Sequence, residues 1–244
     1  MDARIESGLT LSAAAINGLR RDALNQLTAL RARREIPALS KIRRIPHFSG
    51  FRGTPSVTVQ VTTAQQITPA LLRMKPSVLY VPMHILLSDS LFCRSLVSQT
   101  TVAAVLPRIC HDGEIAGLKE GMQTLRSWGV RQVLVGNLGH LLPARECNME
   151  IHGDFGLNLY NSAAVNAVRD LELISATLSF EMTLPQIRDV SKAVPCEMLI
   201  YGRLPLMVTE NCLIRNRNGQ CTCHTPTKLT DKTGADFPII KDGA

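Results

Sequence analysis

The sequence predicts an α/β protein built around a parallel (β/α) barrel, which can be complete or incomplete. Seven short apolar runs rich in β-branched residues alternate with longer segments of helical periodicity, as in a parallel sheet with right-handed crossovers. No Gly-x-Gly-x-x-Gly motif follows the first run, which argues against an open dinucleotide-binding sheet. Polar residues follow several of the runs, at the strand ends where barrel active sites lie. Together these features favour a TIM-type barrel.

The first of three predicted regions is residues 1–55, a basic helix followed by a linker. The helix is expected over residues 10–35, where Thr10 or Ser12 can cap the first turn. The linker is expected over residues 36–55, because three prolines and two glycines there exclude a regular helix. The apolar face of the helix carries Ile16, Leu19, Ala23, Leu27 and Leu30.

The second region, residues 56–205, contains the predicted barrel, and the third, residues 206–244, is an irregular cysteine-rich segment. The apolar runs predict strands at 56–61, 77–81, 102–107, 131–135, 149–153, 175–179 and 197–201. The segments between them predict helices starting at Thr63, then across 84–96, 113–128, 137–144, 162–170 and 183–192.

The net charge of +7 is concentrated in the N-terminal region, where residues 1–53 hold ten basic and four acidic side chains. Such a basic segment is suited to nucleic-acid phosphates. A solvated helix face, or a docking surface for the remainder of a longer polypeptide, explains the charge equally well. The residues predicted to contact RNA are Arg20, Arg21, Arg31, Arg33 and Arg34.

Several classes of protein are disfavoured by what the sequence lacks. No apolar run approaches the ~18 residues that span a bilayer, so no membrane partner is expected. The first twelve residues do not form a signal peptide, which predicts a cytoplasmic location. Neither His-Glu-x-x-His nor Gly-x-Ser-x-Gly is present, so a zincin-type protease and a nucleophile elbow are unsupported.

The C-terminal segment brings soft metal ligands together over thirteen positions. Thiolates at this density favour zinc or an iron–sulfur cluster over hard cations. Free thiols on a Gly/Asn-rich tail are the alternative. The predicted ligands are Cys212, Cys221, Cys223 and His224.

A second candidate site lies at the strand ends. Asp154, Asn158 and Asn161 can orient a polar ligand on the barrel face, and His152 can supply acid–base chemistry. Helix capping by Asn161 and loop hydrogen bonds from Asp154 are the structural alternatives. Glu181 and Glu197 can form an acid–base pair or instead be satisfied by backbone amides.

Four stretches resemble the collagenase-like peptidase family, also called peptidase family U32. They are LTLSAAAINGLRRDA (9–23), GDFGLNLYNS (153–162), LSFEMTLPQI (178–187) and EMLIYGRLPLMVTENC (197–212). The last of these is the most specific. The likeness is to the second barrel-like half of the long members of the family and covers nearly the whole chain. In the family motif Glu197, Gly202 and Cys212 match, whereas Pro205 stands where the family has its first cysteine.

The resemblance implies two activities. Some members of the family resemble RNA-modifying factors that hydroxylate a pyrimidine base, with an iron–sulfur cluster and a small organic acid, prephenate, implicated. The family name implies a peptidase, which at this site could be metal-dependent. The missing cysteine at Pro205 adds a third reading, a non-catalytic duplicate half that completes the fold or binds a partner. Thiolate-rich ligation favours RNA base hydroxylation over hydrolysis.

Overall fold

The computed structural model describes residues 8, 10–33, 46–49, 53–220, 222 and 225–240, in two compact units, Met1–Arg44 and Ile45–Ala244. The first unit contains the helix α1 (Ala13–Ala32), whose first turn is capped by the Ser12 hydroxyl accepting from the Ala15 amide at 3.2 Å. The capped helix confirms the predicted start near Ser12. None of the residues of α1 is buried, and its apolar face, including Leu19 and Leu30, is exposed.

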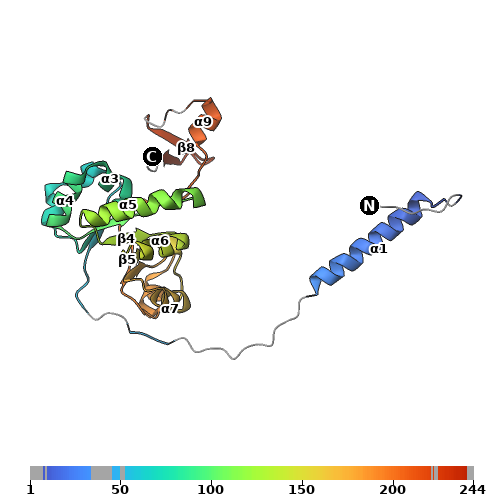
Figure 1. Ribbon diagram of the computed structural model, residues 1–244, viewed down its shortest axis with the longest axis horizontal. Coiled ribbons are helices and arrows are strands. Elements are labelled where there is room, and N and C mark those ends of the chain that lie inside the picture. The colour runs from blue at the N-terminus through green and yellow to red at the C-terminus, as the bar shows by residue number, and fades with distance from the viewer. Residues whose placement is uncertain are drawn as a thin grey trace. The chain divides into compact units, whose positions relative to one another are not determined.

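The second unit is built on a parallel sheet that curls into a half-barrel with helices between its strands (Figure 1). Within the described residues the sheet has seven strands, ordered as in the chain, so each strand pairs with the next one in sequence. This confirms the predicted (β/α) barrel in its incomplete form. The strands are β1 (Thr58–Gln60), β2 (Val78–Pro82), β3 (Val102–Val105), β4 (Gln132–Val135), β5 (Glu150–Gly153), β6 (Ser175–Thr177) and β7 (Cys196–Glu197).

Helices follow the strands as the sequence pattern predicts. The α-helices are α2 (Pro69–Arg73), α3 (Met83–Ser88), α4 (Ser90–Gln99), α5 (Ile115–Ser127), α6 (Leu141–Glu146), α7 (Ser162–Asp170) and α8 (Leu184–Asp189). Short 3₁₀ turns precede several of them, namely η1 (Ala64–Gln66), η2 (Asp112–Glu114), η3 (Leu138–His140) and η4 (Phe155–Leu157). The C-terminal segment adds α9 (Leu213–Asn218) and an antiparallel hairpin of β8 (Thr227–Thr230) and β9 (Asp236–Ile239).

Three predicted elements differ in the structure. The helix predicted to start at Thr63 is only the 3₁₀ turn η1, and α2 begins separately at Pro69 with Thr68 as its cap. The helix predicted across 84–96 is divided at Asp89, whose extended backbone ends α3 and whose carboxylate caps α4 by accepting from Leu91 and Phe92. The strand predicted at 197–201 ends at Glu197. Beyond it the apolar side chains are exposed, reaching 98% at Tyr201, so burial does not hold them in the sheet.

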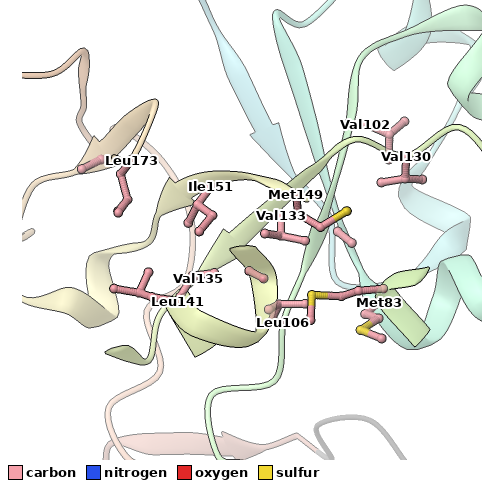
Figure 2. Packing of buried hydrophobic residues seen from close by; sticks show 14 of the residues in the cluster. Met83, Val102, Leu106, Val130, Val133, Val135, Leu141, Met149, Ile151 and Leu173 are labelled. Atoms are coloured by element: carbon pink, nitrogen blue, oxygen red, sulfur yellow. The ribbon is translucent and has the colours of Figure 1, made fainter. Parts of the chain in front are cut away.

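Alternation along the strands divides the apolar residues between two cores. The larger core lies between the outer face of the sheet and the helices, as Figure 2 shows for Val133, Val135, Ile151 and Leu141. The smaller cluster, Tyr80, Ala103 and Leu134, lies on the other face of the same strands. Every second residue of a strand therefore points to the inner face of the curled sheet, where polar side chains from neighbouring strands come together.

Part of the predicted linker is fixed to the second unit. The buried Ser191 hydroxyl accepts from the Phe48 amide at 2.8 Å and donates to the Pro46 carbonyl at 3.1 Å. The Arg169 guanidinium lies over the Phe48 ring at 5.0 Å. The chain therefore contacts the region just before β7 on its way to β1. Among the described residues no helix is both long and apolar enough to cross a membrane.

Candidate functional site

A hydrogen-bonded network inside the curl centres on Glu197 of β7. Its Oε1 accepts from the Tyr80 hydroxyl of β2 and from the Ser175 hydroxyl of β6, both at 2.7 Å. Its Oε2 accepts from the Thr58 hydroxyl of β1 at 3.0 Å. The first and last strands of the sheet are thus linked through one carboxylate. Burial, with the adjacent Glu197 charge, raises the pKa of Tyr80, so the phenol stays protonated and donates.

His152 of β5 extends this network across the sheet. Its Nδ1 lies 2.6 Å from the Ser175 hydroxyl and its Nε2 lies 3.2 Å from Oε1 of Gln132 on β4. The Tyr80 ring packs edge-on against the imidazole at 5.4 Å. Burial lowers the pKa of His152, whereas the charges of Glu197 and Glu150 act in the opposite direction. The effect of burial is the larger, so the neutral imidazole is favoured.

The Ser175 hydroxyl has one proton and two acceptors within reach. When His152 is protonated, Nδ1 donates to Ser175 and Ser175 donates to Glu197. When His152 is neutral, with Nε2–H donating to Gln132, Ser175 donates to Nδ1 and no longer to Glu197. Ser175 therefore lies between the imidazole and the carboxylate. A hydrolytic triad needs the imidazole between the hydroxyl and the acid, so this order does not activate Ser175 as a nucleophile.

Asp154 follows β5 at the carboxyl end of the sheet and is buried. Its Oδ1 accepts from the Phe155 amide at 2.7 Å, which starts η4. Burial raises the pKa of Asp154, while the Phe155 amide and the Arg108 charge oppose the shift. The carboxyl group is thus available as a proton donor at a higher pH than an exposed aspartate.

Asp154→Asn tests this environment through the pH dependence of stability. A carboxyl whose folded-state pKa is raised contributes stability below its unfolded-state pKa, and that contribution is lost as the pH rises through the folded-state value. Replacement by Asn keeps the Oδ1 acceptor and removes the titration. The free energy of unfolding, measured in urea at a series of pH values, should fall as the pH rises above 3.8, the ordinary pKa of the carboxyl group. We expect this fall to be smaller in the variant than in wild type. If the free energy of unfolding depends on pH in the same way in both proteins, the pKa of Asp154 is not raised in the folded state.

An open groove of about 550 Å³ lies beside Asp154, at the ends of β3, β4 and β5. Arg108 stacks its guanidinium over the Phe155 ring at 4.8 Å, and Phe155 packs edge-on against Phe180 at 5.7 Å. The Asn137 side chain is fixed by accepting from the Gly139 amide at 2.9 Å and donating to the Arg108 carbonyl at 3.3 Å. The lining residues are Arg108, Ile109, Gly136, Asn137, Leu138, Gly156, Leu157 and Val208.

Two glycines make the polar side of this groove possible. A Cβ on Gly156 would lie 2.7 Å from the Gly136 carbonyl oxygen and 3.2 Å from a guanidinium nitrogen of Arg108. A Cβ on Gly136 would lie 3.4 Å from Oδ2 of Asp154. The loops after β4 and β5 therefore approach each other backbone to backbone, which leaves room for Arg108 above Phe155.

The other predicted ligand residues have structural contacts. Asn161 caps α7 by accepting from the Ala164 amide at 3.0 Å, which is the alternative role expected for it. Asn158 ends η4 in the left-handed region with φ of 51°. Glu181 is exposed after β6, whereas Glu197 lies in the interior network, so the structure does not bring these two carboxylates into a pair.

Of the predicted metal ligands, only Cys212 lies within the described residues; Cys221, Cys223 and His224 lie outside them. The Cys212 sulfur caps α9 by accepting from the Arg215 amide at 3.4 Å. In the described part of the chain, no three His, Cys, Asp or Glu side chains are close enough together to hold a metal ion. The donor chemistry of the full set, three thiols and an imidazole, fits zinc or an iron–sulfur cluster.

Sequence reasoning did not identify Tyr80, Ser175, Thr58 and Gln132 of the network, or Arg108 of the groove. The signal for the first four was strand alternation, because each lies on the same face as the interior cluster. Arg108 carried no such signal, since its place over Phe155 depends on the contact between two loops.

Comparison with known proteins places this site in a family. No curated protein matches the chain. A model described as peptidase family U32 matches residues 93–230, more than half of the chain. The matched segment includes His152, Asp154, Glu197, Arg108 and Cys212, whereas β1 and β2 precede it. The chain belongs to peptidase family U32.

Proposed function

We propose that this chain is the barrel-like half of a longer protein that supports RNA base hydroxylation. The proposal rests on the position of the C-terminal segment, residues 206–244, which contributes a side chain to the groove beside Asp154. Val208, four residues before Cys212, lines the same groove as Arg108 and Asn137. A small organic acid such as prephenate is the proposed occupant, because a guanidinium and an amide face the groove among apolar side chains.

The tail would hold the redox group in this proposal. Cys212, Cys221, Cys223 and His224 are the proposed ligands of an iron–sulfur cluster, with zinc as the alternative metal. When bound, a cluster supplies one-electron redox chemistry. The contribution of the described residues is to bind the organic acid at Arg108 and to hold a proton at Asp154, whose raised pKa makes it a donor.

The peptidase reading has less support. The interior network places Ser175, not His152, between its neighbours, and the Ser175 hydroxyl is buried. A peptide bond in the groove would have no activated serine beside it. The reading as a non-catalytic duplicate rests on Pro205 in the position of a family cysteine and predicts neither cluster nor RNA binding.

The basic N-terminal unit is the proposed RNA contact. Arg20, Arg21, Arg31 and Arg33 are exposed on or next to α1, and Arg34 lies outside the described residues. Long cationic side chains on a solvated helix suit phosphate contacts, which position RNA without reading its sequence.

Replacing Arg20, Arg21 and Arg31 by Gln tests this interaction. We expect binding of a structured RNA, followed by fluorescence anisotropy, to weaken. The slope of log K against log salt should become shallower by about one unit for each phosphate that an arginine no longer neutralises. The matched control is Arg188→Gln, which removes an exposed charge from the barrel unit. Equal affinity and salt slope in the triple variant and wild type would favour the duplicate reading.

A further inference from the structure

The segment after β7 lies against the barrel at only a few described places. Residues 201–211 are all exposed and contain no helix or strand. Val208 nevertheless lines the groove, and Oε1 of Glu210 lies 2.7 Å from Nε2 of His111, in the loop after β3. Local order comes from the Thr209 hydroxyl donating to the Asn211 carbonyl at 3.1 Å.

The two ends of the segment after β7 differ in how tightly their conformation is restrained. At one end Gly202 has φ of 145°, in the region that favours glycine, and a Cβ there would meet nothing within 4 Å. At the other end Cys212 caps α9, and Ile214 of α9 is buried. One end is therefore a conformationally permissive residue in open space, and the other is anchored by packing.

We infer that residues 203–212 form a strap over the groove, in which Val208 determines ligand specificity and Glu210 positions it by pairing with His111. Segments with little buried surface open at low free energy, and a ligand that packs against the closed form shifts the population towards it. A ligand in the groove beneath Val208 would pack against the closed strap and so favour it. The strap then excludes water from Arg108, which strengthens its attraction for an anion.

The lining of the groove defines the ligand that the strap accepts. Arg108 and Asn137 supply the polar side, and Val208, Leu157 and Leu138 supply apolar surface. An anionic group would bind at Arg108 while an apolar ring packs under Val208. The inference rests on the proposed ligand role of the groove, and its tests require neither RNA nor a metal at the tail.

Hydrogen exchange of the strap amides, read by mass spectrometry on the whole chain, tests the positioning role. His111→Ala and Glu210→Ala each remove one partner of the exposed His111–Glu210 hydrogen bond and should speed exchange at 206–211 by about two- to fivefold, with an unchanged melting temperature. The matched control, Asp189→Ala, removes the acceptor of the exposed Arg188–Asp189 pair and should leave the strap unaffected. Unchanged strap exchange in both His111→Ala and Glu210→Ala would overturn the inference.

Benzoate and its neutral isostere benzamide test the specificity role. Benzoate should slow strap exchange in wild type and benzamide should not, because only the carboxylate pairs with Arg108. Val208→Ala should reduce the protection by benzoate without changing strap exchange in its absence. The proposal that the strap closes over a bound ligand would be contradicted if benzoate slowed strap exchange equally in Val208→Ala and wild type. It would also be contradicted if benzoate did not slow strap exchange in wild type. RNA binding measured on the same samples separates this failure from failure of the proposed function.

Discussion

Replacing Glu197 with alanine is expected to lower the free energy of unfolding by about 2–4 kcal/mol, because buried hydroxyl donors lose their acceptor. Tyr80 and Ser175 are both buried, and both donate to Oε1 of this carboxylate at 2.7 Å. Thr58 of β1 loses its link to β7 in the same variant. Urea unfolding followed by circular dichroism measures the effect.

Glu197→Gln is the matched control for this prediction. The amide keeps one acceptor oxygen for Tyr80 and Ser175, but it replaces Oε2, which accepts from Thr58, with a donor group and removes the charge. Its cost should therefore be about 1–2 kcal/mol, below that of alanine. If both variants unfold like wild type, the carboxylate does not organise the interior of the barrel.

Gly156→Ala is expected to cost about 1–3 kcal/mol and to remove binding of benzoate to the groove. The added methyl carbon would lie 2.7 Å from the Gly136 carbonyl oxygen, a backbone atom that cannot turn aside as a side chain can. Separating the two loops would also displace the Arg108 guanidinium from Phe155. Chemical denaturation gives the stability, and a benzoate titration gives the affinity of the groove.

Gly117→Ala is the comparison for this effect. Gly117 lies in α5, and a Cβ there would meet nothing within 4 Å. Alanine in an open helical position should stabilise the protein by about 0.5–1 kcal/mol and leave the groove unchanged. A Gly156→Ala protein as stable as Gly117→Ala would show that the loops after β4 and β5 tolerate separation.

The barrel was predictable because its strands are short apolar runs separated by helical periodicity, a signal contained in local sequence. The elements that differ are those in which tertiary contacts decide the outcome. Residues 198–201 have the composition of a strand, yet their side chains are exposed and β7 ends before them. Asp89 is short and polar, and its role as a cap divides a run that periodicity alone extends.

The site was predictable only in part. Asp154 and His152 stand out as polar residues at the end of an apolar strand, and the structure buries both. Their partners come from other strands, so pairing register rather than sequence spacing joins Ser175 to His152 and Glu197. Arg108 and Val208 come from distant segments and line the same groove, a relation that no local pattern encodes.

Metal and sulfide analysis of the anaerobically purified protein, compared with its Cys212→Ala variant, tests the central functional proposal most directly. We expect iron and acid-labile sulfide in the wild-type protein and neither in Cys212→Ala, with the barrel of the variant still folded by circular dichroism. Zinc in place of iron, together with cleavage of gelatin by the purified protein, would contradict the hydroxylation proposal and favour a peptidase.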